Sequence, residues 1–230
     1  MGESSDIVYI VKNKIDPDEL RYSLRSLRHF PHGKVWIYGG KPEGIKADEQ
    51  VAYLQTGISK WEKVRNSLDK VCQNDDITES FWLFNDDFFC MKDCNYLPPV
   101  YHGTLHDRIK ELKQRHGASE YMRKLMQTEY ILKRAGKPTL NYAVHMPMLI
   151  NRKKALEVLK VFDRCPMFRS LYGNYFGIGG EDREDVKIYL TYEEPSPDCD
   201  WLSTTDTSFR HGVVGDFIRE NLKEASEYEV

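Results

Sequence analysis

The chain alternates short β-prone runs with helical patterns, and this alternation limits the folds that it can adopt. Residues Ile7 to Val11 (IVYIV) form a continuous apolar run, as expected of a strand buried on both faces. Asp16, Pro17 and Glu19 then predict a helix start, with Asp16 as its N-cap. A second run begins at Val35 (VWIY). These residues predict a strand–helix–strand unit, whose right-handed parallel form is strongly preferred.

The same order repeats in the next fifty residues. Gln50 to Leu54 (QVAYL) is the third expected strand, Ser59 to Glu62 is a capping box that opens a helix, and Phe81 to Phe84 is the fourth expected strand. We therefore expect an α/β fold with a mostly parallel central sheet flanked by helices. In such sheets ligands bind outside the carboxyl ends of the strands.

The second half of the chain has weaker patterns. Two helices are expected between Arg108 and Lys137, broken near Gly117, and another helix after Asn151. Asp185 to Tyr192 alternates as a half-buried strand, and Val214 to Leu222 is the last expected helix. The residues expected on the buried side of that strand are Val186, Ile188, Leu190 and Tyr192.

Length and composition favour one globular domain. The chain has 230 residues, 40% of them hydrophobic and 30% charged, and no run approaches the roughly 20 apolar residues of a membrane span. We expect residues 1–95 to form a nucleotide-binding half and residues 96–230 a helical, acceptor-side half. The five cysteines form no CxxC pair, which is typical of reduced thiols in a cytoplasmic protein.

The charge is unevenly distributed. The total, 33 − 36 = −3, is mildly acidic, yet residues Arg108 to Lys137 contain nine basic and three acidic side chains. This stretch is interpreted either as the solvated face of the expected helices or as a patch for an anionic partner. An anionic glycan, a lipid head group or a lipid-linked acceptor, and DNA are partners of that kind.

Two adjacent carboxylates follow the fourth expected strand, in FWLFNDDFFC. Asp86 and Asp87 converge only if the strand ends there and turns, because successive strand side chains point to opposite faces. A convergent pair suits Mg²⁺ or Mn²⁺, hard cations that take carboxylate oxygens. The alternative is a polar turn in which Asp86 caps backbone N–H groups and Asp87 is solvated. The residues leave both interpretations open.

Three segments resemble the Stealth family of capsular polysaccharide phosphotransferases. FWLFNDDFF is similar to the hydrophobic-NDDFF segment of that family, DELRYSLRSL (Asp18 to Leu27) to a segment that precedes a strand, and HMPMLI (His145 to Ile150) to its His-Met-Pro segment. The start DIVYIV is also similar, but Lys12-Asn13-Lys14 stands where that family has Trp-Val-Asp-Gly. The resemblance implies transfer of a sugar phosphate to a glycan.

A broader resemblance is to the GT-A glycosyltransferases, which implies a Rossmann-like GT-A fold. Their Asp-x-Asp-like motif at a strand end, later x-Glu-Asp motif and C-terminal histidine correspond in order to residues 85–87, residues 180–182 and His211. WEKVRNSL resembles the helix that sends a basic residue and an Asn toward the nucleotide, here Arg65 and Asn66.

This resemblance implies a set of roles. A nucleotide-sugar donor would bind with Mn²⁺ or Mg²⁺, whose ligands would be Asp87, Asp86 and His211. Arg65, Asn66 and Asn85 would contact the nucleotide. The base would be Asp182 or Glu181, and His145 would serve in catalysis or in acceptor or phosphate binding. The alternatives are a solvated acidic loop at 181–185 and a buried, hydrogen-bonded His145.

We expect first a metal-dependent glycosyltransferase that moves a sugar from a nucleotide sugar to an acceptor hydroxyl. A Stealth-type sugar-phosphate transferase ranks second because of the replacement at residues 12–14. Sugar transfer to DNA bases, as performed by some phage enzymes, is a third expectation, from the basic stretch. A fourth is an α/β module that binds a nucleotide or glycan without turnover.

Overall fold

The computed structural model describes residues 4–13, 17–116, 119–162 and 167–230. The strands are β1 (Ile7–Val11), β2 (Val35–Gly39), β3 (Glu49–Ala52), β4 (Ser80–Phe84), β5 (Phe88–Cys90), β6 (Val100–Tyr101), β7 (Met148–Asn151), β8 (Glu181–Asp182), β9 (Lys187–Ile188) and β10 (Trp201–Thr204). The helices are α1 (Pro17–Ser26), α2 (Lys60–Gln73), α3 (Leu105–His116), α4 (Glu120–Arg134), α5 (Arg152–Val161), α6 (Phe168–Phe176), α7 (Asp206–His211) and α8 (Val213–Asn221), with a 3₁₀ turn at Leu27–His29. The expected N-cap Asp16 and helix break Gly117 lie outside the described residues.

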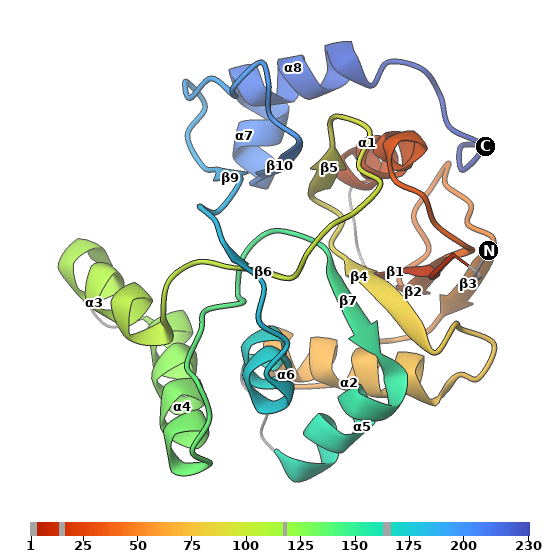
Figure 1. The fold of residues 1–230 in the computed structure, drawn as a ribbon. Helices are drawn as coiled ribbons and strands as arrows, with labels where there is room; N and C mark the ends of the chain where they lie inside the picture. Colours follow the sequence, from red (N-terminus) through yellow and green to blue (C-terminus); the bar gives the residue numbers. More distant parts are fainter. Residues whose placement is uncertain (1–3, 14–16, 117–118, 163–166) are drawn as a thin grey trace.

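The main sheet has the strand order β3-β2-β1-β4-β7. Strands β3, β2, β1 and β4 are mutually parallel, whereas β7 runs antiparallel to β4. The expected α/β class and the mostly parallel, helix-flanked sheet are therefore confirmed (Figure 1). The four strands expected from the first half of the sequence are present with small shifts at their ends.

Different helices cover the two faces of the main sheet. Ile7 and Tyr9 of β1 lie in one buried apolar cluster with Leu24 of α1. Val8 lies in the other cluster, with Leu68 of α2, because successive strand residues point to opposite faces. In Figure 1, α1 lies above the sheet, and α2 and α5 lie below it. The periodicity of each segment predicts that helices flank the sheet, whereas the tertiary structure decides which face each helix covers.

The second half of the chain completes the main sheet and contributes to two others: the three-stranded sheet β5-β10-β9, here called the smaller sheet, and the two-stranded pair β6-β8. Strand β7 pairs with β4, while β10 pairs antiparallel with β5 and parallel with β9. The expected halves, 1–95 and 96–230, are thus interlocked by strand pairing. In the smaller sheet Ser203 lies opposite both Phe88 and Lys187, which brings these residues beside the turn that follows β4.

The strand expected at Asp185 to Tyr192 is mostly wrong. Only Lys187–Ile188 pair as a strand, and the chain then turns. Ile188 is buried, but Leu190 and Tyr192 are exposed. A two-residue pairing with β10 does not extend the alternation, so the inward direction predicted for these side chains does not hold.

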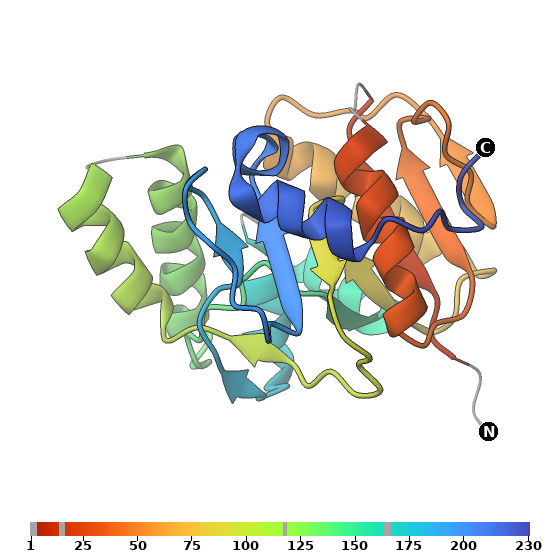
Figure 2. The same ribbon diagram turned by 90° about the horizontal axis from the view of Figure 1, so that it is seen from above.

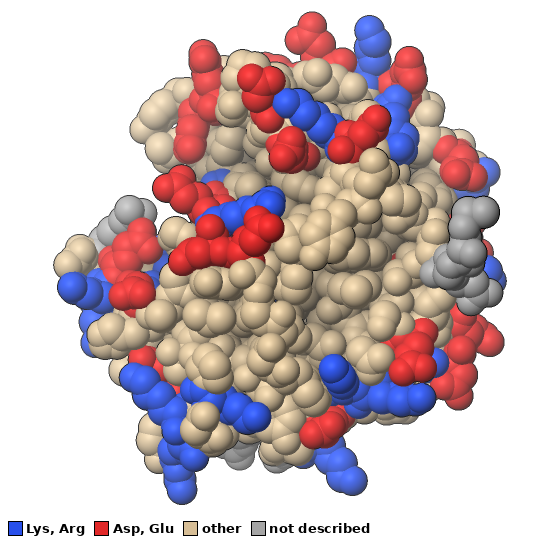
Figure 3. Space-filling model, viewed as in Figure 1, with Lys and Arg blue, Asp and Glu red and all other residues tan. Residues whose placement is uncertain are grey.

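Helices α3 and α4 contain the basic stretch of the sequence. Figures 1 and 2 both place them at the end of the molecule opposite β3. Basic side chains gather over α4 at the lower left of Figure 3. Several are paired within the two helices, such as Arg108 with Glu111 and Lys133 with Glu129. None of the described helices is both long and apolar enough to cross a bilayer.

Asp6 links the start of β1 to neighbouring segments of the chain through buried hydrogen bonds. Its carboxylate is 4% exposed and accepts hydrogen bonds from Lys34 N, Trp36 Nε1 and Thr78 N. We expect Asp6→Ala to lower the free energy of unfolding by about 3 kcal/mol, since it strands buried donors.

Urea unfolding followed by tryptophan fluorescence measures this change. The exposed Asp76→Ala is the matched control and should change stability by less than about 0.5 kcal/mol. A loss in Asp6→Ala no larger than that of the control would contradict the role assigned to Asp6.

Candidate functional site

The chain turns sharply after β4, and this turn directs both aspartates inward. Phe88 N donates to Asn85 O at 3.4 Å, so Asp86 and Asp87 occupy the centre of the turn. Asp87 is 9% exposed and Asp86 is half-buried, whereas Asn85 is exposed. The convergence of the pair is thereby confirmed, and a solvated Asp87 is wrong.

Asp86 and Asp87 line a pocket, here called the acidic pocket, together with two further carboxylates. Glu19 comes from the first turn of α1, and Asp206 begins α7. The pocket has a volume of about 400 Å³, and Lys12 and Lys187 also line it. Four acidic and two basic side chains therefore meet at the carboxyl edge of the main sheet.

The crowding of these carboxylates changes their acidity. Burial, followed by the neighbouring charge of Asp87, raises the pKa of Asp86 to about 6. Burial also raises the pKa of Glu19 to about 8, although a hydrogen bond from Thr204 opposes the rise. Glu19 shares a side-chain hydrogen bond with Asp206, which requires a proton between the two carboxyl groups. At neutral pH Glu19 therefore retains a proton that a bound cation would displace, whereas Asp86 is mostly ionised.

Asp87 already has a positively charged partner. Lys187 Nζ lies 2.7 Å from Asp87 Oδ2, and Ser203 Oγ donates to the same oxygen at 3.1 Å. Both partners come from the smaller sheet, so the pairing of β5, β10 and β9 places them beside the turn after β4. The carboxylate of Asp87 is thus held in one orientation.

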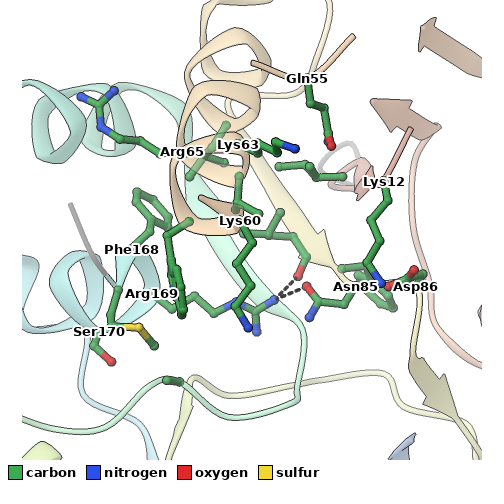
Figure 4. Close-up of a pocket in the computed structure, with 18 residues that line it drawn as sticks. Lys12, Gln55, Lys60, Lys63, Arg65, Asn85, Asp86, Phe168, Arg169 and Ser170 are labelled. Atoms are coloured by element: carbon green, nitrogen blue, oxygen red, sulfur yellow. Dashed lines mark hydrogen bonds between the residues drawn. The ribbon is translucent and has the colours of Figure 1, made fainter. Parts of the chain in front are cut away.

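A second cavity opens on the other side of Asp86 (Figure 4). Its volume is about 400 Å³, and its apolar wall includes Trp61, Val64 and Phe168. The basic side chains that line it are Lys12, Lys60, Lys63, Arg65 and Arg169, and its acidic lining residue is Asp86. A cavity of this size with aromatic walls and several cations suits a flat, anionic ligand.

Arg169 is the most enclosed of these cations. Its guanidinium donates to the carbonyls of Leu83, Val144 and Met146 and to Asn85 Oδ1. Burial lowers its pKa to about 10, against the charges of Asp87 and Asp185. The side chain therefore remains charged at neutral pH and fastens the end of β4 to the 144–146 segment.

Asp86 and Lys12 line both spaces, so the acidic pocket and the basic cavity adjoin. Lys12 follows directly after β1, and Asp86 follows β4, the strand that pairs with β1. Parallel strands end at the same edge of a sheet, which places the two residues together. Figure 4 shows the Lys12 and Asp86 side chains side by side, and the positive charge of Lys12 lowers the pKa of Asp86 against the effect of burial.

His145 and Asp185 form a hydrogen-bonded pair near the turn. His145 Nδ1 lies 2.8 Å from Asp185 Oδ2, and His145 N donates to Asp185 Oδ1 at 3.0 Å. Burial would raise the pKa of Asp185, but the hydrogen bonds and charge of His145 hold it below its usual value. The His145 ring stands edge-on to Phe88, with centroids 6.5 Å apart. The imidazole is therefore oriented from both sides, and it is not a buried residue bonded only to backbone.

The structure does not bring the other expected residues to the acidic pocket. Glu181 and Asp182 are exposed in β8: Glu181 pairs with Arg183, and Asp182 accepts from Gly103 N at 3.0 Å. His211 is exposed at the far end of α7 from Asp206. None of these three residues lines either cavity.

The two residues expected beside the nucleotide are engaged elsewhere. Arg65 lines the basic cavity, but its guanidinium donates to Leu159 O at 2.8 Å and points toward α5 (Figure 4). Asn66 Nδ2 donates to Thr56 O at 3.1 Å and holds the loop before α2. Asn85 does line the cavity, as expected.

Sequence reasoning missed Glu19, Asp206, Lys187, Arg169 and Asp185. An acidic residue in the first turn of a helix is expected, so nothing in the sequence places Glu19 beside the strand ends as well. Asp206 likewise follows Thr205, the residue that caps α7. Arg169 and Lys187 have no local signal at all. Asp185 lies three residues after Asp182 in the same acidic segment, and it is the member that pairs with His145.

The side chains in the acidic pocket fit a hard divalent cation in their chemistry. Carboxylate oxygens are the ligands that Mg²⁺ and Mn²⁺ prefer, and burial, together with the charges of neighbouring carboxylates, raises the pKa values of Asp86 and Glu19. Within the described ranges, no three His, Cys, Asp or Glu side chains already form a metal-binding group. Asp86 and Asp87, with Glu19 and Asp206, are the residues that would hold the cation.

Comparison of the chain with models of known protein families finds no match, and a search among curated proteins finds no relative. The resemblances noted in the sequence therefore remain expectations.

The raised pKa values predict how stability depends on pH. The pKa of Asp86 rises from 3.8 to about 6 and that of Glu19 from 4.5 to about 8 on folding, so the folded chain binds more protons than the unfolded chain between these limits. Stability that is present at pH 4 is therefore lost as the pH rises toward 8. In EDTA, we expect Asp86→Asn to reduce this loss by about 1–2 kcal/mol.

Urea unfolding in EDTA at pH 5 and pH 8 measures the effect. The exposed Asp76→Asn serves as the matched control and should leave the pH dependence as it is in the wild type. An equal pH dependence in wild type and Asp86→Asn would show that Asp86 does not carry the shift.

Proposed function

We propose that the chain is a metal-dependent glycosyltransferase of GT-A type that uses a nucleotide-sugar donor. The observation that carries this proposal is the shared wall, Asp86 and Lys12, between an aromatic, basic cavity and a pocket of carboxylates. A nucleotide sugar has the matching parts in the same order. Its base is flat, its diphosphate is anionic and binds a divalent cation, and its sugar lies beyond the diphosphate.

The basic cavity supports the donor assignment. Trp61 and Phe168 offer aromatic walls to a base, and Lys60 Nζ lies 4.6 Å from the centre of the Trp61 ring. Lys60 and Lys63 come from the first turn of α2, where N–H groups also favour a phosphate. The side chains of Lys60 and Arg169 extend into the cavity in Figure 4.

The acidic pocket supports the role of the cation. When bound, Mn²⁺ or Mg²⁺ neutralises the charge that builds on the departing diphosphate. Asp86 would face both the cation and the cavity, and Asp87 would be kept in place by Lys187 and Ser203. Lys12 and Arg169 would add fixed positive charge beside the phosphates.

The His145–Asp185 pair supports proton transfer. With the Nδ1–H donating to Asp185, the imidazole presents a lone pair at Nε2, which can accept the proton of an acceptor hydroxyl. The hydroxyl oxygen would then bond to the sugar carbon as the bond from that carbon to the diphosphate breaks. Asp185 acts as a positioning residue that also stabilises the imidazolium. His145 thus replaces Asp182 or Glu181 as the proposed base.

A Stealth-type sugar-phosphate transfer is the second candidate, and one observation favours it. The three Stealth-like segments meet around the turn after β4: DELRYSLRSL supplies Glu19 and FWLFNDDFF the two aspartates of the acidic pocket, and His145 of HMPMLI packs its ring against Phe88, which follows that turn. The same residues would serve either reaction. Mass spectrometry of the product separates them, since a retained phosphodiester indicates sugar-phosphate transfer and a plain glycosidic bond indicates sugar transfer.

Binding of nucleotide sugars is the direct test. We expect a UDP-, GDP- or dTDP-sugar to raise the unfolding temperature more with Mn²⁺ than without it, since a ligand at 100 times its Kd adds about 2.7 kcal/mol of stability. Lys60→Ala should weaken the binding of that donor about tenfold, because a hydrogen bond to a charged group contributes about 1.5–3 kcal/mol.

Calorimetry with the wild type, Lys60→Ala and the exposed Lys160→Ala completes the test. The Lys160 variant is the matched control and should bind as the wild type does. No Mn²⁺-dependent binding of any donor would refute the proposal, and binding without donor hydrolysis would favour a module without turnover.

The base assignment predicts a separate kinetic effect. With water as the acceptor, we expect His145→Ala to lower the rate of donor hydrolysis by about 10²–10⁴-fold, the usual contribution of a general base. Asp185→Asn should also lower this rate, because it removes the group that orients Nδ1. Donor affinity in calorimetry should change little in either variant, as neither residue lines the basic cavity. Hydrolysis at the wild-type rate in His145→Ala would exclude this base.

A further inference from the structure

An exposed aromatic segment follows β9 beside the proposed base. Tyr189, Leu190 and Tyr192 are 50%, 47% and 76% exposed, although the sequence pattern predicts that Leu190 and Tyr192 are buried. Single exposed apolar residues are common, but three large ones within four positions are typical of a binding surface. Their position next to a site with a proposed reaction makes a substrate the first ligand to consider.

Tyr189 is joined to the site through two neighbours. Its ring meets the His145 ring edge to face, with centroids 6.5 Å apart at 89°. Lys187 Nζ lies 6.0 Å from the centre of the Tyr189 ring, and the same ammonium group pairs with Asp87. The half-exposed ring therefore contacts the proposed base and lies near the ammonium group that pairs with Asp87 of the acidic pocket.

The helical pair α3–α4 contributes charged and polar groups in the neighbourhood of Tyr189. Arg108 of α3 hydrogen-bonds the hydroxyl of Tyr121, at the start of α4. The charges of Asp185 and Arg108 both act on Tyr189: burial and Asp185 raise its pKa, and Arg108 lowers it. Charged groups of both signs are thus within electrostatic reach of the Tyr189 hydroxyl.

We infer that Tyr189 is the platform on which a pyranose ring of the acceptor stacks, with its hydroxyls directed toward His145 and the Arg108–Tyr121 pair. The C–H groups of one pyranose face carry partial positive charge, which the π face of an aromatic ring attracts. A hydroxyl of a ring held there lies on the side of the proposed base. This inference rests on the proposed function and specifies the acceptor as a carbohydrate.

The remaining ligand classes fit this surface less well. A nucleotide base has an aromatic cavity of its own between Trp61 and Phe168. Charges of both signs lie near Tyr189, because Asp185 and Glu111 raise the pKa of its hydroxyl, Arg108 lowers it, and Lys187 lies 6.0 Å from its ring. A neutral sugar is compatible with this mixture, since it needs no net charge of either sign.

Saturation-transfer NMR with simple sugars tests the inference. The probes are the methyl glycosides of glucose, galactose, mannose and rhamnose, each offered alone to the wild-type chain. We expect saturation to reach the ring C–H protons of at least one probe, to be lost in Tyr189→Ala and to be kept in Tyr189→Phe. Tyr96→Ala is the matched control, because Tyr96 is 78% exposed on the loop after β5. Thermal unfolding of each variant verifies its fold.

Two results would overturn the platform. One is the absence of transfer from the wild type to all four probes, and the other is undiminished transfer in a folded Tyr189→Ala variant. Failure of the proposed function is detected separately, by the absence of Mn²⁺-dependent donor binding. If sugars bind at Tyr189 but no donor binds, the sugar site stands and the transferase proposal falls.

Discussion

The mutual repulsion of carboxylates at the carboxyl edge of the main sheet is the constraint around which the structure is arranged. Glu19, Asp86, Asp87 and Asp206 line one pocket, and like charges at short range in a partly buried place are unfavourable. Three features offset the repulsion: the raised pKa of Glu19, which keeps that carboxyl largely protonated at neutral pH, the ion pair of Asp87 with Lys187, and the nearby ammonium of Lys12. A structural role alone would be better served by apolar packing, since a buried ion pair contributes little net stability.

The functional interpretation of the acidic pocket depends on the basic cavity beside it. A cluster of acidic side chains by itself is only a place of high negative potential, but here it shares Asp86 and Lys12 with a basic space that has aromatic walls. Asp86 has an acidic pocket on one side and a basic cavity on the other. This arrangement suits an anionic ligand that also binds a divalent cation. Arg169 fastens both sides, because it bonds to the end of β4 and to the segment that precedes His145.

Much of the fold and part of the site could be predicted from the residues. The parallel strands and the helices of the first half follow from local periodicity, and Asp86 and Asp87 were recognisable because they follow a buried strand. Glu19 was not, since a helix start explains it equally well. Asp182 was preferred to Asp185 because the motif points to the former, whereas the partner that distinguishes the latter, His145, is forty residues away.

The sequence by itself determined the alternation of strands and helices, the faces that they bury and the placing of an acidic pair at a strand end. These are properties of neighbouring residues, for which a period of two or of 3.6 is sufficient. Only the tertiary structure decided that β7 joins the sheet antiparallel and that β9 is two residues long. It also decided that Lys187 and Ser203 bind the carboxylate of Asp87. These contacts join residues about a hundred positions apart, and no local pattern encodes which distant groups the packing of the sheets will bring together.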